Sequence, residues 1–419
     1  MSAVLADAPT LTRTVPLSEA VEFNPKPQRG SIAEDLEVSF VPMAAVEAGS
    51  GRMNPSQGRL YGEVKKGFTY FGDGDVLFAK ITPCMENGKM AVAHGLHNGI
   101  GFGSTEFHVL RPRHGVDARY VYHFVSSTTF RREAAHHMTG AVGQKRVPLS
   151  FLQQSELPLP PINEQRRIVA EIEKQFSRLD EAVANLQRVK ANLKRHRAST
   201  LKAATDGTLI GDPGKSGWRD ALIGEVGQVI SGLTKNPKRE ALPRKMPYLR
   251  VANVYANELR LDQIEYIGVA EKEVEKLLVR RGDLLVVEGN GSPDQIGRVA
   301  LWDSSIPDCV HQNHLIKVRL AAEVAPEWAL IWLLSPGGRR EIEQVSSSTA
   351  GLHTLSTGKI SRLPIPVPPL DEQHRIVAEV DRRLSIVREV EAEVDANLKR
   401  AQALRQAVLA RAFAGQAPQ

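Results

Sequence analysis

Leu157–Glu171 reads LPLPPINEQRRIVAE, and Ile365–Glu379 reads IPVPPLDEQHRIVAE. The second stretch begins 208 residues after the first (365 − 157), and ten of the fourteen positions from Pro158 to Glu171 are identical at that offset. Chance or shared helix composition does not produce such agreement, and self-similarity at a fixed offset is typical of a repeated unit. The sequence therefore contains a duplication.

The same offset aligns segments far upstream of the repeated stretch. It carries Gly74–Phe78 onto Gly282–Val286, and Tyr120–Ser127 onto Trp328–Ser335. Each half of the chain is therefore predicted to be one module followed by one tail. The four predicted parts, in chain order, are a first module at 1–152, a first tail at 153–207, a second module at 208–360 and a second tail at 361–419.

Each module is predicted to be a mixed structure of helices and strands, which gives the chain an α+β fold class. Strands are expected where short apolar runs are bounded by Gly, Pro or Asn. The expected strands are Asp75–Ile81, Thr105–Leu110, Asp283–Glu288 and His314–Leu320. Ser31–Gly103 is rich in glycine and turn dipeptides, which indicates a loop-rich, irregular β surface of the kind that carries recognition.

Each tail is predicted to form one long helix. A rigid proline segment comes first, and Asn163 or Asp371 then offers a side-chain oxygen for the helix N-cap. Apolar residues recur every seven residues in both tails, which is the pattern of a coiled-coil seam. The seam residues are Ile172, Leu179, Leu186 and Leu193 in the first tail, with Ala182 and Val189 between them, and Val380, Val387, Val394, Ala401 and Val408 in the second, with Val390 and Leu404.

A helix from Asn163 to about Ala204 is roughly 60 Å long, and its copy has the same length. Neither helix can bury its apolar stripe alone. Two equal copies in one chain can pair around a pseudo-two-fold axis, which makes the helices antiparallel and separates the two modules. In the alternative arrangement, each helix packs only on its own module.

The bulk composition narrows the class of protein. With 419 residues, of which 42% are hydrophobic and 24% charged, the chain is predicted to be a soluble globular protein with two or three cores. A formal net charge of +6 is compatible with a polyanionic partner. Cys84 and Cys309 have no neighbouring Cys or His at zinc-ligand spacing, so disulfides and structural zinc are not expected.

Targeting and metal signals are also missing from the sequence. Met1–Thr10 has no basic region followed by an apolar stretch, and no run approaches the roughly 18 apolar residues of a membrane span. We therefore expect a cytoplasmic protein without membrane attachment. Two pairs of histidines lack an evident third ligand, so no bound metal is expected; the pairs are His136 with His137 and His311 with His314.

Two glycine-containing segments resemble nucleotide-binding loops without fulfilling their pattern. Gly211–Ser216 ends in Gly-Lys-Ser, but the first glycine of a phosphate-binding loop should stand at position 209, which is Leu209. Gly99–Gly103 has alternating glycines but precedes a predicted strand rather than a helix. We interpret the first as a linker between the halves and the second as a turn.

The doubled proline-EQ motif before a long charged helix resembles the specificity subunits of type I restriction-modification systems. The motif residues are Pro160–Gln165 and Pro368–Gln373, and Gly74–Pro83 and Trp218–Glu225 also resemble family segments. The resemblance implies that each module is a target recognition domain for one half of a split, asymmetric DNA site. The helices are then spacers that dock two methyltransferase subunits, with restriction and motor subunits completing the complex.

That resemblance also implies that the chain has no catalytic centre or cofactor of its own. S-adenosylmethionine, ATP and Mg²⁺ would be used by the partner subunits. Half-sites one helical turn apart need readers roughly 34 to 36 Å apart, a distance that a stiff helix pair can set. The length of the helices is therefore predicted to determine the unread gap in the DNA site.

Candidate DNA contacts are the Arg, Lys, Asn, Gln and His side chains in the loops of both modules, since these side chains bind base edges or neutralise phosphates. They are Lys80, Asn87, Lys89, Gln144, Lys145 and Arg146 in the first module and Arg250, Asn253, Asn290, Gln295, Arg298 and His353 in the second. Each is alternatively a solvated surface residue or a turn former. Candidate contacts to partner subunits, or alternatively braces of the helix starts, are Glu164, Gln165, Arg167, Glu372, Gln373 and Arg375.

Two other functions remain open at this point. A complete DNA methyltransferase or nuclease would need clustered carboxylates for magnesium or a glycine-rich cofactor loop with a catalytic motif, and the sequence shows neither pattern. A coiled-coil scaffold that binds only proteins would be equally symmetric. Strong salt dependence of DNA binding would argue against the scaffold.

Overall fold

The computed structural model describes residues 13–28, 30, 32–55, 57–211, 215–289, 295–346 and 354–414. The chain folds into two compact units. Unit 1 contains the residues up to Leu186 and those from Ala396 onward, and unit 2 is Gln187–Asp395. Both divisions fall inside the long helices, so each unit contains one module and a part of each helix.

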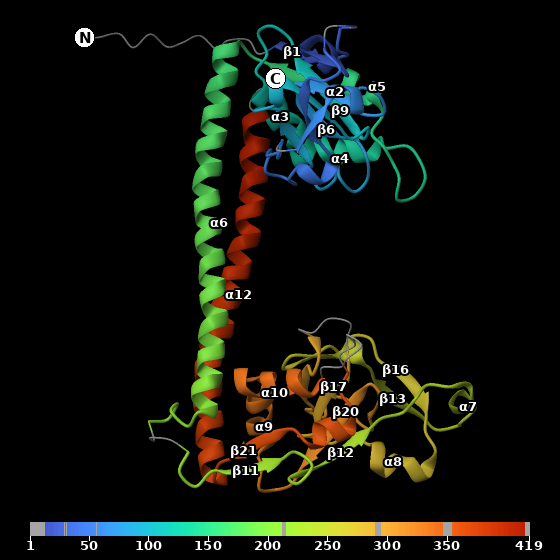
Figure 1. Cartoon of the computed structure of the whole chain (residues 1–419), viewed down its shortest axis with the longest axis vertical. Helices are drawn as coiled ribbons and strands as arrows, with labels where there is room; N and C mark the ends of the chain where they lie inside the picture. Colours follow the sequence, from blue (N-terminus) through green and yellow to red (C-terminus); the bar gives the residue numbers. More distant parts are fainter. Residues whose placement is uncertain are drawn as a thin grey trace. The chain divides into compact units, whose positions relative to one another are not determined.

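Figure 1 shows the part of unit 1 up to Leu186 in blue to green and the part from Ala396 in red. Its strands are β1 (Arg13–Pro16), β2 (Val21–Phe23), β3 (Glu37–Val41), β4 (Gln57–Leu60), β5 (Thr69–Gly72), β6 (Val76–Ala79), β7 (Met90–Val92), β8 (Ile100–Gly103), β9 (Phe107–Pro112) and β10 (Glu156–Leu159). Its helices are α1 (Leu17–Ala20), α2 (Tyr61–Val64), α3 (Ala118–Ser126), α4 (Thr128–His136), α5 (Leu149–Gln154) and the first part of α6 (Ile162–Thr205), with short 3₁₀ turns at Met43–Ala45 and His97–Gly99.

Unit 2 repeats much of this order. Its strands are β11 (Arg219–Leu222), β12 (Gly227–Ser231), β13 (Lys245–Leu249), β14 (Val254–Tyr255), β15 (Glu258–Leu259), β16 (Glu265–Gly268), β17 (Leu284–Val287), β18 (Val299–Leu301), β19 (Val310–His311), β20 (Leu315–Leu320) and β21 (Pro364–Val367). Its helices are α7 (Pro237–Glu240), α8 (Glu271–Leu277), α9 (Pro326–Leu334), α10 (Pro336–Ser346), α11 (Thr357–Ser361) and the first part of α12 (Leu370–Ala414), with a 3₁₀ turn at Val251–Asn253.

One sheet has the same strand order in both units. It is β2-β9-β6-β7 in unit 1 and β12-β20-β17-β18 in unit 2. Its register is duplicated too, because Val76 pairs with Leu110 in unit 1 and Leu284 pairs with Val318 in unit 2. The four strands expected from the sequence correspond to β6, β9, β17 and β20, so those predictions are confirmed.

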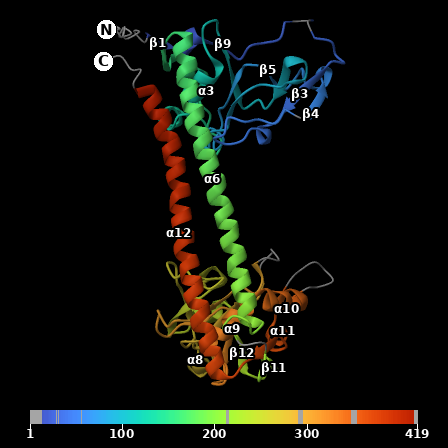
Figure 2. The ribbon, with the colours of Figure 1, turned by 90° about the vertical axis from the view of Figure 1, so that its left-hand side faces the viewer.

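The second sheet differs between the units. In unit 1 it has four strands in the order β4-β3-β8-β5, and Figure 2 shows β3, β4 and β5 lying to one side of α6. In unit 2 it has three strands in the order β16-β13-β19, accompanied by the separate hairpin β14-β15. The range Ser31–Gly103, predicted to be an irregular β surface, contains all four strands of this second sheet and also β6 and β7 of the shared sheet. The duplicated frame therefore carries two different second sheets.

The long helices begin one residue earlier than predicted. Helix α6 begins at Ile162, and the Pro161 carbonyl accepts hydrogen bonds from the backbone amides of Glu164 and Gln165. Asn163 and Asp371 therefore lie inside the first turns, and their prediction as N-caps is wrong. Proline takes the cap position because its fixed φ directs the chain into the helix and its missing N–H has no helical partner to lose.

Within each unit the two helices pack side by side in opposite directions (Figure 1). In unit 1 Arg405 pairs with Asp180, and in unit 2 the Lys190 ammonium lies 2.6 Å from the Asp395 carboxylate. Residue numbers on α12 fall as those on α6 rise, so the predicted antiparallel pairing is confirmed within each unit.

The predicted seam residues face the helix partner or a module. Ile172, Val380, Val387, Val394 and Ala401 are buried, whereas Leu179, Leu186, Leu193 and Val408 are half-buried. The residues predicted to fill the seam between them, Ala182, Val189, Val390 and Leu404, are exposed, so that part of the prediction is wrong. Each helix has a partner helix on one side only, so the contact covers only a narrow apolar stripe of its surface.

The core of each module includes the far end of the other repeat's helix. In unit 1 Leu409 is buried in the core, and the Phe413 ring lies 5.2 Å from that of Tyr120 and 5.4 Å from that of Phe124, between ring centroids. In unit 2 Leu201 and Ala204 of α6 are buried in the core. The alternative in which each helix packs only on its own module is therefore wrong.

Candidate functional site

The start of each long helix is fixed to its module by a buried glutamine. The Gln165 side chain accepts a hydrogen bond from the Asp117 amide (2.9 Å) and donates to the carbonyls of Gly115 (3.1 Å) and Pro160 (2.8 Å). Gln373 makes the same three contacts in unit 2, with Ala325 (2.8 Å), Glu323 (2.9 Å) and Pro368 (2.8 Å). Both glutamines are fully buried, which supports their role as braces of the helix starts.

The charged neighbours of these glutamines have different surroundings. Glu164 forms a two-pronged pair with Arg167, and this hydrogen bonding lowers the pKa of Glu164. Glu372 instead accepts a hydrogen bond from the Trp218 indole at 2.9 Å and is buried. The Arg167 and Arg375 side chains are exposed. Of the six residues predicted to bind partners or to brace the helix, these two arginines are the ones most accessible to a partner.

A buried ion pair links adjacent strands of the shared sheet in each unit. Asp75 on the turn before β6 binds Arg111 of β9, with N–O distances of 2.7 and 2.8 Å, and also accepts from the Gly72 amide. Asp283 and Arg319 repeat this pair in unit 2, at 2.6 and 2.8 Å. Each carboxylate raises the pKa of its arginine. The carboxylates are buried and the arginines are half-buried, so these pairs hold the frame together.

In the first module the structure brings Lys80, Gln144, Lys145 and Arg146 into one place, which we call the loop corner. The Thr82 amide donates to the Lys145 carbonyl (3.0 Å), and the Val147 amide donates to that of Lys80 (2.9 Å). Gln144, Lys145 and Arg146 lie on the loop between α4 and α5, which Figure 1 shows projecting from the module, and Lys80 follows β6. The backbone hydrogen bonds place Lys80 beside this loop.

The positively charged side chains at the loop corner differ in how freely they could contact a polyanion. The Arg146 guanidinium binds Glu106 at 2.7 and 2.9 Å, which lowers the pKa of Glu106. Lys80 and Lys145 form no ion pair within the described part of the chain, and Gln144 and Lys145 are exposed. The two lysines are therefore available to a polyanion.

The other two candidates of this module follow Lys80 along the chain, and the Lys89 carbonyl accepts a hydrogen bond from the Ala79 amide at 3.1 Å. Asn87 is exposed, in the turn that follows β6. The Lys89 ammonium is half-buried and donates to the Met43 carbonyl at 2.9 Å, so its donors are partly used inside the module.

The candidates of the second module separate into internal and accessible groups. Asn253 is buried and binds the Arg250 amide (2.8 Å) and the Arg260 carbonyl (2.7 Å), which makes it a turn former. Arg250 pairs with Glu265 at 2.6 Å. Gln295 is exposed, and the Arg298 guanidinium lies 4.7 Å from the centroid of the Tyr255 ring.

Asn290 and His353 lie outside the described residues. Their described neighbours Gly289 and Thr354 form an antiparallel bridge, as Ile81 and Arg146 do at the loop corner of unit 1. Since the offset between these pairs is 208 residues, the same corner exists in both modules.

The chain is matched by a family model described as the type I restriction modification DNA specificity domain, over residues 15–195 and 215–396. The chain belongs to this family. A relative, the specificity subunit of type I restriction enzyme EcoEI from Escherichia coli, is 40% identical over 161 residues, which is 38% of this chain and 27% of the relative. This match spans about a quarter of the relative's length.

Longer but weaker similarity covers more of the type I specificity fold. The EcoKI specificity subunit from Escherichia coli strain K12 is 27% identical over 319 residues, 74% of this chain and 67% of the relative. A solved structure described as the structural basis underlying complex assembly and conformational transition of the type I R-M system has a TM-score of 0.77. It is 20% identical and covers 97% of this chain and 98% of that one. This likeness shows the fold.

The histidines of this family member do not form a metal site among the described residues, where no group of three or more His, Cys, Asp or Glu is placed to hold an ion. His311 is buried and its Nδ1 lies 2.7 Å from the Leu315 carbonyl, whereas His314 pairs with Glu288 at 2.7 Å. His137 stacks on Phe151. In the described part of the chain, no helix is long and apolar enough to cross a membrane.

Sequence reasoning missed one group of side chains in the type I specificity frame of unit 2. Arg197, Arg339 and Arg388 line one cavity together with Arg298, which the sequence predicted only as a DNA contact. A signal was present in the duplication, because Arg388 stands at the offset position of Asp180 and reverses its charge.

Proposed function

We propose that this chain is the DNA sequence-specificity subunit of a type I restriction-modification complex, in which each module reads one half of a split, asymmetric DNA site. The observation that carries the proposal is the combination of a duplicated frame with two different second sheets. The identical frame would hold both reading surfaces in the same orientation relative to their own module. The two second sheets differ, so the two modules would recognise different base sequences.

The loop corner supports duplex DNA as the ligand. Lys145 is exposed and forms no ion pair among the described residues, half-buried Lys80 adds positive charge that also acts on Glu106, and Gln144 is an exposed amide of the kind that pairs with adenine edges. Phosphate contacts by the lysines position the duplex, and polar side chains beside them read base edges. In unit 2 the exposed Gln295 stands at the offset position of the exposed Asn87.

We further propose that the helix pair docks two DNA methyltransferase subunits and, through them, restriction and motor subunits. Exposed Arg167 and Arg375 near the helix starts, and the exposed apolar residues Ile386 and Leu404, support docking on the helices. The chain would need no cofactor itself and catalyse no reaction, while its partners use S-adenosylmethionine, ATP and Mg²⁺. Such a complex would act on DNA in the cytoplasm.

The test is to co-express the chain with type I methyltransferase and motor subunits and to map base methylation across the host genome by single-molecule sequencing. We expect a split, asymmetric motif with a fixed gap that disappears when the chain is omitted. Replacing both Lys80 and Lys145 with Ala should reduce methylation at this motif. The base sequence of the half-site read by the second module should stay the same. Methylation that persists unchanged without the chain would refute the proposal.

The matched control replaces Lys65 with Ala. This lysine also belongs to the first module, but it is paired with Glu34. We expect the control to leave the motif and the extent of methylation unchanged. Binding to duplex DNA that does not depend on salt concentration would instead favour a protein-binding scaffold, because phosphate contacts release counterions.

A further inference from the structure

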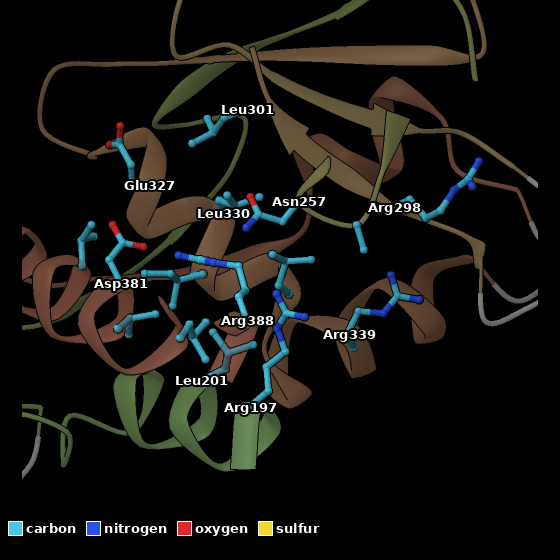
Figure 3. A pocket seen from close by; sticks show the side chains of 16 residues that line it. Arg197, Leu201, Asn257, Arg298, Leu301, Glu327, Leu330, Arg339, Asp381 and Arg388 are labelled. Carbon is cyan, nitrogen blue, oxygen red and sulfur yellow. The ribbon is translucent and has the colours of Figure 1, made fainter. Parts of the chain in front are cut away.

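Unit 2 contains a cavity of about 400 Å³ between its module and its two helix segments. Figure 3 shows side chains from α6, α9, α10 and α12 around it, with Asn257 beside Leu330. Its apolar wall is formed by Leu201, Leu330, Ile331, Val380 and Leu384, all of which are buried. The volume is sufficient for a small organic ligand or for one edge of a larger one.

Four arginines line this cavity against two carboxylates. They are Arg197, Arg298, Arg339 and Arg388, and the carboxylates are Glu327 and Asp381. Figure 3 shows Arg197 and Arg388 in the middle of the cavity, Glu327 and Asp381 towards one end and Arg298 and Arg339 towards the other. The lining therefore carries two more positive than negative charges.

Two of the four arginines, Arg197 and Arg388, carry charge that no described residue neutralises, whereas Arg339 donates to the Ile296 and Gly297 carbonyls. Arg197 and Arg388 form no hydrogen bond or ion pair within the described residues. Arg298 donates to the Val251 carbonyl at 3.4 Å, and its buried Nε has no partner among the described residues. Arg197 is half-buried and Arg388 is exposed, so solvent screens part of the repulsion between these like charges, and a bound anion removes the rest.

The duplication supplies an internal comparison, because the equivalent place in unit 1 is neutralised. There Arg405 takes the position of Arg197, and Asp180 takes that of Arg388. Arg405 and Asp180 form an ion pair. Unit 1 therefore has a salt bridge where unit 2 has two guanidinium groups.

Larger side chains also occupy this place in unit 1. Phe176 stands where unit 2 has Leu384, and the Arg405 guanidinium lies 4.3 Å from the centroid of its ring. Tyr122 stands where unit 2 has Leu330. In unit 2, smaller side chains leave space and a carboxylate has been replaced by an arginine, so both the volume and the charge favour an added anion.

We propose that the cavity of unit 2 is a phosphate-binding site, with Arg197 and Arg388 as its principal ligands. The planar guanidinium fork offers paired N–H donors that match phosphate oxygens, and two forks from two helices can hold one phosphate from both sides. The phosphate comes either from the DNA backbone or from a small phosphoryl compound. The proposal rests on the proposed function only where DNA is the source.

The test compares the full chain with the variants Arg388→Asp and Arg197→Gln. Arg388→Asp reproduces the charge arrangement of unit 1, so we expect the new carboxylate to pair with Arg197 and the variant to remain folded. Arg197→Gln removes the other ligand without adding a charge of opposite sign. The control Lys272→Asp makes the same change in net charge on exposed helix α8, away from the cavity lining.

Two measurements distinguish the sources of the phosphate. In the first, inorganic pyrophosphate and AMP are titrated and the melting temperature of each protein is followed. In the second, binding to duplex DNA is measured over a range of salt concentrations. One lost phosphate contact should lower the slope of log K against log salt by about 1.

If a small phosphoryl compound is the source, pyrophosphate or AMP stabilises the wild type and the control, and both cavity variants bind it at least about tenfold more weakly. If the DNA backbone is the source, both cavity variants show the lower salt slope and the control does not. The proposal is overturned if the cavity variants match the control in both measurements. A wild type that binds pyrophosphate but no DNA would contradict the proposed function and leave this site standing.

Discussion

His311 is a buried titratable side chain that couples the stability of unit 2 to acid. Its Nδ1 lies 2.7 Å from the Leu315 carbonyl, and its Nε2 is buried without a hydrogen-bond partner among the described residues. Protonation would therefore place a charge and an unsatisfied N–H in the core. Burial lowers the pKa of His311 to about 4.

Because an unfolded histidine titrates near pH 6.5, the unfolded chain takes up a proton between pH 6.5 and 4 that the folded chain does not. Unit 2 should lose stability as the pH falls through this range, by at most about 3 kcal/mol from this group. His311→Asn keeps a donor near the Leu315 carbonyl and should flatten the dependence. Urea denaturation at several pH values measures the effect.

The exposed His374→Asn variant, whose histidine lies on the surface of α12, is the control and should leave the pH dependence unchanged. An equal dependence in the His311 variant and the wild type would exclude His311 as its source.

The fate of individual residues shows how far the sequence can predict a site. Residue type identified Lys80, Lys145 and Gln144 as candidate contacts, and the structure places them together at one corner. The same reasoning selected Asn253 as a base-reading amide, but the structure uses it inside a turn. An amide in a loop has the same appearance in a sequence in both cases, because its hydrogen-bond partners are set by tertiary contacts.

At the scale of elements, the helices and the strands of the shared sheet could be predicted because their apolar periodicity is long or repeated. The cap of α6 was predicted two residues too late, since Pro161 rather than Asn163 takes that position. The second sheets could not be predicted. Their strands are short and irregular, and β3 pairs with β8 across some 60 residues of intervening chain, which local patterns do not encode.

The glutamine brace is the element contact whose loss should be easiest to measure. Gln165→Leu leaves the Asp117 amide and two carbonyls without their side-chain partner, which should lower the free energy of unfolding of unit 1 by about 3 kcal/mol. Gln373→Leu should have the same effect on unit 2. Hydrogen exchange measured by mass spectrometry would show faster exchange in the corresponding unit.

The control for both variants is Gln187→Leu. This glutamine is exposed on α6, and its replacement should change the stability by less than about 0.5 kcal/mol. If the brace variants behaved like this control, the three hydrogen bonds would contribute nothing measurable.

At the scale of the whole molecule, the duplication was the most informative feature of the sequence. A single offset of 208 residues predicted two modules and two helices, and the same offset relates the glutamine braces and the buried ion pairs. What the offset could not reveal is where the copies differ in space. The cavity of unit 2 arises from such differences: the change from Asp180 to Arg388 is visible at the offset, but the space that Arg388 lines is not.

The proposed spacer role of the helices gives a prediction for the complete complex. Seven residues inserted into α6 after Leu186 and seven into α12 after Asp395 preserve the heptad pattern and add about 10 Å of helix. The unread gap in the methylated motif should grow by about three base pairs, while both half-sites keep their sequence. Methylome sequencing of cells with the lengthened chain would measure the gap.

The control inserts three residues into each helix at the same points. This change breaks the heptad pattern and should abolish methylation rather than lengthen the gap. A gap that stays the same length after the seven-residue insertions would refute the spacer role.

The sharing of helix ends between repeats also has a consequence for synthesis in the cell. The core of unit 1 needs Leu409 and Phe413, but the 209 residues of Gln187–Asp395 (395 − 187 + 1) are translated before the returning segment begins. At about 5 to 20 residues per second, a ribosome takes roughly 10 to 40 seconds to make them. During that interval the first module lacks part of its core, and the apolar side chains that Leu409 and Phe413 will cover are exposed. We therefore expect chaperones to bind the nascent first module.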